Sequence, residues 1–319
     1  MVFPLLCCVF LIYLVSKASF LSTQLTTIIE NNPIYVDQER NDYYKKDSFI
    51  FVQNTDSFVP LSKGDLKNIF FTVVNSGWNN FTFYCPSEYT SCLTDMKEFS
   101  QDQNMLTHIN NFVHPYNSFS NIKTTLSESG EITIQVEYLY TDEQIAQIEQ
   151  KMTEIIIQEI DTTDSLYDQI KTMHDYLINT TKYDVTRNEN GDSTYLSYLA
   201  YGPLFEGFAT CNGYTDAMAI FLARLQLPNY KIATTPEDLQ EQNEGHVWNA
   251  VYLDKEWLHL DLTWDDPVSK DGKDYLQHKY FLVNNEELEE ADDGTVEVLE
   301  HRFKKNVYLE FKEQKKDID

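Results

Sequence analysis

The sequence predicts an α+β protein whose C-terminal unit packs a cysteine-bearing helix against an antiparallel sheet. Residues 209–225 place apolar side chains at the spacing of one helix face. Residues 246–263 form two runs of alternating apolar and polar residues around Asp254-Lys255, the pattern of a tight β-hairpin. Upstream, residues 48–140 mix helix caps with strand-like runs, which predicts a small α+β unit.

The N-terminal unit is predicted from local signals. Two capping-box patterns, Ser62 to Asp65 and Ser100 to Gln103, indicate the starts of helices. The run FTFYC predicts a strand, and residues 122–140 predict a hairpin that turns near Ser129-Gly130. Strands and helices in this order are typical of a small α+β fold.

The C-terminal unit is predicted to start with two helices. Thr141 to Gln144 forms a third capping box, and an apolar stripe follows it to Ile156. A second stripe runs from Leu166 to Leu177, and residues 185–194 are expected to form a polar loop. The cysteine-bearing helix and the hairpin come next along the chain.

The chain length and its N-terminus predict the domain organisation. A length of 319 residues suggests about two domains. Residues 2–15 are apolar without a break, which is shorter than the roughly 20 residues of a spanning helix. Ser16-Lys17-Ala18 fits a cleavage site, although no basic residue precedes the apolar run; the alternative is a buried N-terminal helix. We therefore predict a signal peptide or membrane anchor at 1–22, a linker at 23–47, an N-terminal domain at 48–140 and a C-terminal domain at 141–319.

The net charge of the chain and its N-terminal segment restrict the binding partners and the cellular location that we expect. The 51 acidic residues against 24 basic ones give a net charge of −27. Such a balance opposes binding to nucleic acid or to anionic membrane surfaces and favours a neutral or basic substrate. The N-terminal segment predicts an extracellular or cell-surface protein, with membrane attachment only through that segment.

The chain has five cysteines, and their positions divide them into two pairs and a single residue. Cys7 and Cys8 lie in the N-terminal apolar run, whereas Cys85 and Cys92 flank six residues rich in turn formers. In an oxidising compartment the second pair is predicted to form a disulfide; the alternative is that both stay reduced. Cys211 then has no partner, which marks it as a candidate reactive thiol.

Cys211 sits at the start of the apolar stripe of its helix. Thr210 precedes it as a candidate N-cap, and Tyr214 continues the same face. A thiol in the first turn experiences the positive end of the helix dipole, which favours the nucleophilic thiolate. Gly213 lets another segment approach closely. The alternative is a buried and inert cysteine.

The hairpin register brings a histidine and an aspartate together. If Leu253 pairs with Glu256, then Trp248 faces Asp261. His246 becomes a diagonal neighbour of Asp261, at a backbone separation of roughly 7–8 Å. The carboxylate can then bind one ring nitrogen and leave the other for a thiol, as a nucleophile, base and orienting acid require.

This order of cysteine, histidine and aspartate resembles the transglutaminase-like superfamily of papain-like thiol enzymes, in its bacterial secreted or surface form. The resemblance covers roughly residues 163–290 and rests on the segments IKTMHDYLINTTKYD, TCNGYTDAMAIFL, GHVWNAVYLDKEWLHLDLTWDDP and HKYFLVNNEEL. It implies a papain/transglutaminase-like core within a transglutaminase-like domain at 141–319. By motif, Cys211 is the nucleophile, His246 the general base and acid, and Asp261 the orienting residue.

The resemblance implies amide chemistry through a Cys211 thioester. Water would resolve it in a protease or amidase, and an amine in a cross-linking transferase; both remain open. The expected substrate is a protein or peptide, associated with the cell wall or surface, and no cofactor or metal is expected. Trp248 and Tyr214 are candidates for the wall of the substrate cleft; for Trp248 ordinary core packing is the alternative.

Two other functions stay open at this point. The first is an inactive transglutaminase-like domain that binds or scaffolds at the cell surface. The second is a metal enzyme in which His259, Asp261 and His246 form a two-histidine, one-carboxylate site for iron.

The remaining histidines are expected to have structural roles. His174 is expected in the core or just behind the site, and His108 and His114 within the N-terminal unit. His278 and His301 are expected at the surface or in a strand.

Overall fold

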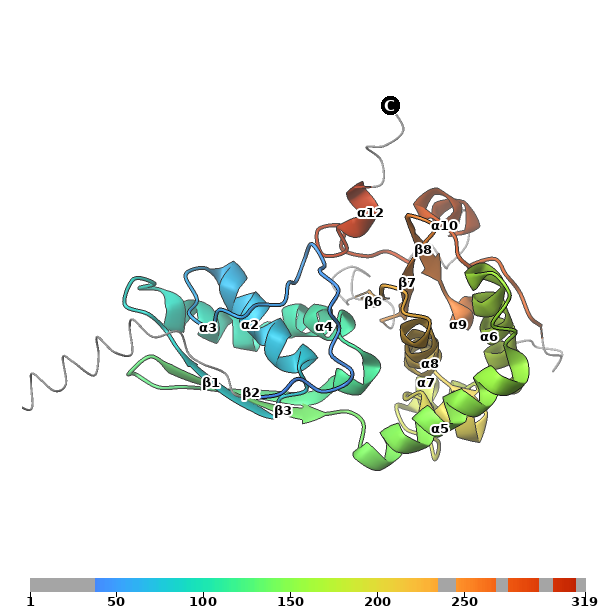
Figure 1. Cartoon of the computed structure of the whole chain (residues 1–319), viewed down its shortest axis with the longest axis horizontal. Helices are drawn as coiled ribbons and strands as arrows, with labels where there is room; N and C mark the ends of the chain where they lie inside the picture. Colours follow the sequence, from blue (N-terminus) through green and yellow to red (C-terminus); the bar gives the residue numbers. More distant parts are fainter. Residues whose placement is uncertain (1–37, 235–244, 268–274, 293–300, 314–319) are drawn as a thin grey trace, which may run out of the picture.

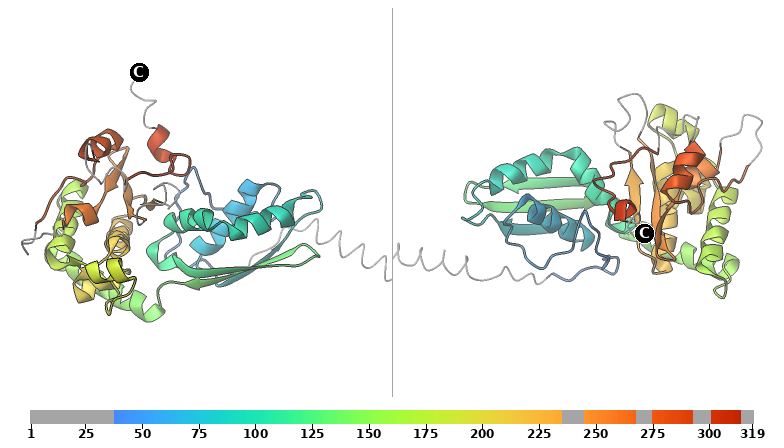
Figure 2. Two further views of the ribbon diagram at one scale, coloured as in Figure 1. Left: turned by 180° about the vertical axis from the view of Figure 1, so that it is seen from behind. Right: turned by 90° about the horizontal axis from the view of Figure 1, so that it is seen from above.

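The computed structural model describes residues 38–234, 245–267, 275–292 and 301–313. These residues form an elongated molecule with two three-stranded sheets, one after the other along its length (Figures 1 and 2). The predicted signal peptide or anchor at 1–22 and most of the predicted linker lie outside these residues. Among the described helices, none combines the length and the apolar character needed to cross a membrane. The secondary structure is mixed helix and strand, which confirms the predicted α+β class.

The N-terminal sheet has three antiparallel strands. Its strands in chain order are β1 (Asn80–Tyr84), β2 (Phe119–Leu126) and β3 (Glu131–Tyr138), and β3 lies in the centre. The predicted hairpin is therefore present, with its turn at 127–130. One face of the sheet is covered by α2 (Lys63–Asn75), α3 (Cys92–Gln101) and α4 (Gln103–Asn111), and the short turn η1 (Pro115–Asn117) follows α4 (Figure 1).

The predicted helix caps are partly confirmed. The Ser62 side chain accepts a hydrogen bond from the backbone N–H of Asp65, so the first cap is correct. The second is wrong, because α3 extends to Gln101 and places Ser100 inside a helix that was not predicted. Asp102 caps α4 instead, and its carboxylate accepts from the N–H of Met105 at 2.9 Å.

The predicted disulfide between Cys85 and Cys92 is present. Their Cα atoms are 5.8 Å apart, and the bond joins the end of β1 to the first residue of α3. Cys92 is buried in the hydrophobic core that this helix shares with the sheet. The disulfide therefore fixes α3 to the edge strand it follows.

Helices dominate the next part of the chain. The capping box at Thr141 and Gln144 starts the first of them, as predicted. The predicted polar loop at 185–194 is wrong in its first half, because Asp184 caps a short helix there. The elements are α5 (Asp142–Glu159), α6 (Leu166–Thr180), α7 (Val185–Asn190), the π-helical turn η2 (Gly202–Glu206), and the parallel strand pair β4 (Lys182–Tyr183) and β5 (Phe208–Ala209).

The cysteine-bearing helix α8 (Cys211–Arg224) packs on the second sheet. This sheet contains β6 (Asn229–Ala233), β7 (Val247–Leu253) and β8 (Glu256–Leu260), all antiparallel. Leu253 pairs with Glu256, so the predicted hairpin register is confirmed. The turn residues Asp254 and Lys255 adopt positive φ angles of 50° and 72°, as a type I′ turn requires.

The second predicted strand ends earlier than expected. It stops at Leu260, because Asp261 caps the short helix α9 (Leu262–Asp265) instead of continuing the strand. The chain then returns along β8, where His259 and Val283 form an antiparallel bridge. The last elements are α10 (Asn285–Asp292) and α12 (Glu310–Glu313).

Close contacts hold α8 in one position on β7. The Thr215 hydroxyl donates to the carbonyl of Val247 at 3.1 Å, and the Asn249 amide donates to the carbonyl of Thr215 at 3.0 Å. On the opposite side, a Cβ on Gly213 would lie 2.2 Å from the carbonyl oxygen of Ser197. The predicted close approach at Gly213 is therefore confirmed.

The hydrophobic core continues from the N-terminal sheet into the second one. Phe112 at the end of α4 packs against Tyr230 on β6, with ring centroids 4.9 Å apart. Lys45, in the described end of the predicted linker, is buried and donates to the carbonyl of Asn229 at 2.6 Å. The predicted domain boundary between residues 140 and 141 falls between β3 and α5 and stays a prediction.

Gly213→Ala should lower the free energy of unfolding by about 2–3 kcal/mol, because the new methyl group meets rigid backbone. Urea unfolding measures this change. Gly64→Ala is the matched control, since the nearest atom to its Cβ is the flexible Ser62 Oγ at 3.5 Å. The control should stay neutral or gain up to about 1 kcal/mol from helix propensity. Equal stability of both variants would contradict the assigned contact.

Candidate active site

Cys211 is the first residue of α8, and its thiol is free and partly exposed. Thr210 occupies the N-cap position as predicted, but its side chain does not cap the helix. Its hydroxyl instead lies 3.4 Å from the carbonyl of Ser197. Backbone N–H groups in the first turn of a helix lack intrahelical acceptors, so this end of α8 offers donors beside the thiol.

His246 lies between the thiol and a carboxylate. Its Nε2 is 2.5 Å from Asp261 Oδ2, and the Cys211 side chain lies close enough to the ring to raise its pKa. The His246 backbone N–H donates to the hydroxyl of Thr234 at 2.7 Å, which holds the start of β7 in place. The three residues predicted from the sequence therefore meet in space, and their catalytic roles stay predictions.

The electrostatics of the pair favour opposite charges. Burial alone would lower the pKa of His246, but the charge and hydrogen bond of Asp261, and the contact with Cys211, raise it well above 6.5. Burial alone would raise the pKa of Asp261, but His246 and His301 hold it well below its usual range. Both groups are buried, so water screens their interaction little.

A second imidazole shares the same carboxylate. His301 Nε2 lies 2.9 Å from Asp261 Oδ2, and His301 Nδ1 lies 2.8 Å from Asp292 Oδ1. The expectation of a surface or strand position for His301 is wrong, because its side chain is 1% exposed. It lies 40 residues after Asp261 with no local spacing pattern to link them, so sequence reasoning missed it.

Asp261 thus accepts hydrogen bonds on both carboxylate oxygens. Oδ2 faces the two histidines, whereas Oδ1 accepts from the N–H groups of Thr263 at 2.9 Å and Trp264 at 3.4 Å. The two hydrogen bonds to Oδ1 form because Asp261 is the N-cap of α9. The end of the strand therefore fixes the carboxylate that holds His246.

The two residues proposed to wall a cleft are in the core instead. Trp248 is 0% and Tyr214 1% exposed, so neither lines an open surface in this structure. Trp248 stacks on the ring of His246, with centroids 5.6 Å apart and an interplanar angle of 18°. The Tyr214 hydroxyl donates to Asp266 Oδ2 at 2.5 Å. Both side chains support the site from within.

His259 does not lie with His246 and Asp261 as the predicted two-histidine, one-carboxylate iron site requires. Its Nδ1 accepts from the indole N–H of Trp248 at 3.0 Å, and its Nε2 lies 2.9 Å from Asn285 Oδ1. Burial lowers the pKa of His259 to about 3, so it is neutral at physiological pH. The set of His246, His259 and Asp261 is therefore not assembled.

The other histidines lie where the sequence suggested. His174 is buried on α6, and His108 and His114 are buried in the N-terminal part of the chain. His278 is exposed on the segment before the β8 bridge.

One comparison with known proteins finds a family match over this part of the chain. Residues 155–262 match the family model described as the Transglutaminase-like superfamily. The match contains α8, β7 and β8, together with Cys211, His246 and Asp261. This part of the chain is a transglutaminase-like core, and the predicted resemblance to the superfamily is confirmed. Its bacterial secreted or surface form stays a prediction.

Two solved structures are similar at low identity. A crystal structure of a TGase is 17% identical with a TM-score of 0.34, over 49% of this chain and 47% of that one. A candidate cysteine protease from Cytophaga hutchinsonii is 12% identical with a TM-score of 0.29, over 45% of this chain and 61% of that one. The chain thus spans less than two thirds of either protein, and scores this low say nothing about activity. No curated protein matches the chain.

Asp261→Asn should lower the pKa of His246, because the main charge that raises it is removed. NMR titration of the imidazole measures this change. Protonated His246 stabilises the fold fully below about pH 6.5, the value expected for the unfolded chain, and this stability is lost as pH rises through the raised folded-state pKa. Asp261→Asn should therefore not show this loss of stability as the pH rises.

Asp292→Asn is the matched control, since Asp292 contacts His301 and is not among the causes of the His246 shift. It should leave the pKa of His246 closer to wild type than Asp261→Asn does. An unchanged pKa in Asp261→Asn would contradict the assigned pair.

Proposed function

We propose that this chain is a cysteine enzyme that acts on amide carbonyl groups through a thioester on Cys211. One observation carries the proposal: a buried His246 contacts the thiol on one side and the Asp261 carboxylate on the other. The transglutaminase-like core supports it, because this arrangement gives a nucleophile, a base and an orienting acid on separate elements.

The first half of the reaction forms the thioester. His246 accepts the thiol proton, and the Cys211 sulfur attacks the carbonyl carbon of the substrate. The backbone N–H of Cys211 in the first turn of α8 is placed to stabilise the oxyanion. His246 then protonates the leaving nitrogen, the C–N bond breaks, and ammonia or an amine departs.

The second half regenerates the thiol. Water or an amine attacks the thioester carbonyl and gives a proton to His246, which returns it to the leaving sulfur. Water yields a carboxylic acid, as in a protease or amidase, and an amine yields a new amide, as in a cross-linking transferase. Asp261 keeps its negative charge throughout, because its depressed pKa disfavours protonation.

The place of action is part of the proposal. A disulfide is typical of proteins outside the reducing cytosol, and Cys85 and Cys92 form one here. With the apolar N-terminal run, this supports action outside the cell or at its surface, on a protein or peptide substrate. The net charge of −27 favours a neutral or basic substrate.

A small activated ester, p-nitrophenyl acetate, tests the chemistry without knowledge of the substrate. The wild type should release a burst of about one nitrophenolate per chain and carry an acetyl group on Cys211, which mass spectrometry detects. Cys211→Ala should lower ester cleavage by roughly 10³-fold or more, because the nucleophile is gone. Glu256→Gln, exposed at the hairpin turn, is the control and should behave as wild type.

Unchanged ester cleavage in Cys211→Ala would overturn the proposal, because another group would then cleave the ester. No burst in the wild type would also contradict it and favour a binding or scaffold domain. Adding a primary amine then separates the two reaction outcomes. Faster loss of the acetyl group with formation of the acetylated amine indicates a transferase, and an unchanged rate of hydrolysis indicates a hydrolase.

A further inference from the structure

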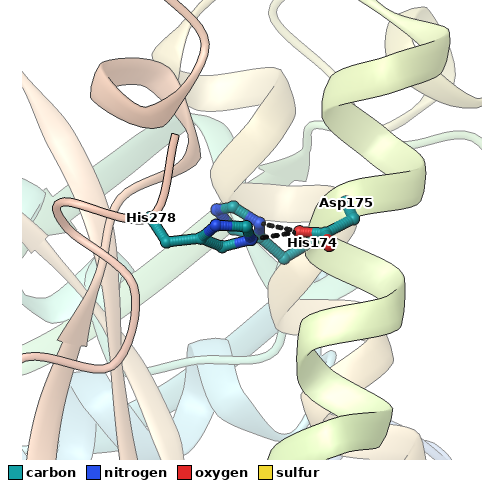
Figure 3. A group of neighbouring side chains, drawn as sticks. All are labelled: His174, Asp175 and His278. Atoms are coloured by element: carbon teal, nitrogen blue, oxygen red, sulfur yellow. Dashed lines mark hydrogen bonds and ion pairs between the residues drawn. The ribbon is translucent and has the colours of Figure 1, made fainter. Parts of the chain in front are cut away.

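We propose that His174, Asp175 and His278 bind a divalent transition-metal ion, with Zn²⁺ as the best match. Two of these residues are neighbours on α6, and the third lies on the segment between α9 and α10 (Figure 3). One ligand atom from each lies within 4.8 Å of the others. Two imidazoles and one carboxylate form a donor set that suits zinc and iron.

Two ring nitrogens contact the same carboxylate oxygen. Asp175 Oδ1 is 2.9 Å from His174 Nδ1 and 2.7 Å from His278 Nε2. The two rings stand side by side, with centroids 5.2 Å apart, and both turn a nitrogen toward the carboxylate (Figure 3). Zinc bonds of about 2.0–2.1 Å in a tetrahedron place ligand atoms roughly 3.3 Å apart. Small side-chain shifts therefore suffice to admit an ion.

A buried carboxylate behind His174 gives a second geometric argument. The His174 Nε2 lies 3.2 Å from Asp265 Oδ2, and both side chains are 0% exposed. On the other side of the ring, His174 Nδ1 lies 2.9 Å from Asp175 Oδ1. A histidine that binds a metal through one nitrogen and a carboxylate through the other is the usual arrangement of metal sites.

Asp265 also positions the third ligand. Its Oδ1 accepts from the N–H of Tyr280 at 3.0 Å, and its backbone carbonyl accepts from the N–H of Gln277 at 2.9 Å. These two bonds bracket His278 and hold its segment against the end of α9. The same carboxylate that orients His174 thus places His278, so the cluster is a built arrangement of three chain segments.

The site is open to solvent on one side. The side chains of Asp175 and His278 are 23% and 35% exposed, so an ion can enter and keep water as a further ligand. Lys171 contacts the outer oxygen of Asp175 at 2.7 Å, which leaves Oδ1 for the ion. Its positive charge opposes a bound cation, so Lys171 weakens the site and offers a test.

A bound ion would hold α6 against the segment that carries His278, and this segment is bonded to Asp265 at the end of α9. Asp265 ends α9, and Asp261, the predicted orienting residue, caps the same helix at its start. The ion would therefore stabilise the helix that carries the Asp261 carboxylate. This role is separate from the proposed reaction, and no step of that reaction passes through the metal.

Zinc titration of tag-free protein by calorimetry tests the proposal. Cys211→Ala serves as the parent, because a thiol next to His246 can itself bind zinc. The parent should bind one Zn²⁺ per chain and gain thermal stability with it. Adding His278→Ala should weaken binding roughly 10–100-fold and abolish most of that gain, while Lys171→Met should tighten binding. His278 is exposed, so its removal leaves the fold intact.

Two results would overturn the proposal. One is a parent that binds no Zn²⁺ at millimolar concentration. The other is equal affinity with and without His278→Ala, which would place the ion elsewhere, for example at His246, Asp261 and His301. The test is distinct from that of the proposed enzyme, since the parent already lacks the nucleophile.

Discussion

The structure depends on one buried carboxylate. Asp261 is 2% exposed and accepts four hydrogen bonds, two from imidazoles and two from backbone N–H groups. A buried charge without partners costs several kcal/mol, so its donors must stay in place for the fold to be stable. Those donors come from the start of β7, the first turn of α9 and the segment at His301. One side chain therefore joins its own helix start to the start of β7 and to the segment at His301.

The same carboxylate links the fold to the chemistry. Because Asp261 stays charged, it holds His246 in one orientation and favours the imidazolium form. His301 extends this hydrogen-bonded chain to Asp292, so two imidazoles share Asp261 between them. The position of α8, fixed by Gly213 and Thr215, then brings Cys211 to the free side of His246. The position of the thiol beside His246 therefore depends on the sheet that carries His246 as well as on α8.

Sequence reasoning succeeded where the signal is local. The register of β7 and β8 follows from alternation around a two-residue turn, and it alone placed His246 beside Asp261. The same approach found Gly213, because a glycine in an otherwise apolar helix indicates a close contact. These features need only the chemistry of neighbouring residues.

Sequence reasoning failed where tertiary contacts determine the position of a residue. His301 reaches Asp261 across 40 residues, and nothing in its own neighbourhood predicts that contact. Trp248 was placed on the correct face of its strand, but burial behind His246 depends on the aromatic rings packed against it. Ser100 had the pattern of a cap and lies inside α3, since Asp102 offers the stronger competing cap.

The central claim is that Cys211 and His246 act as one reactive pair. Its most direct test is the rate of iodoacetamide alkylation at Cys211 between pH 5.5 and 9, read by peptide mass spectrometry in wild type and in His246→Ala. A functional pair predicts rapid labelling of the wild type in mildly acidic solution and a much slower reaction in the variant. Equally slow labelling of both proteins across that range would show an inert core cysteine and contradict the account.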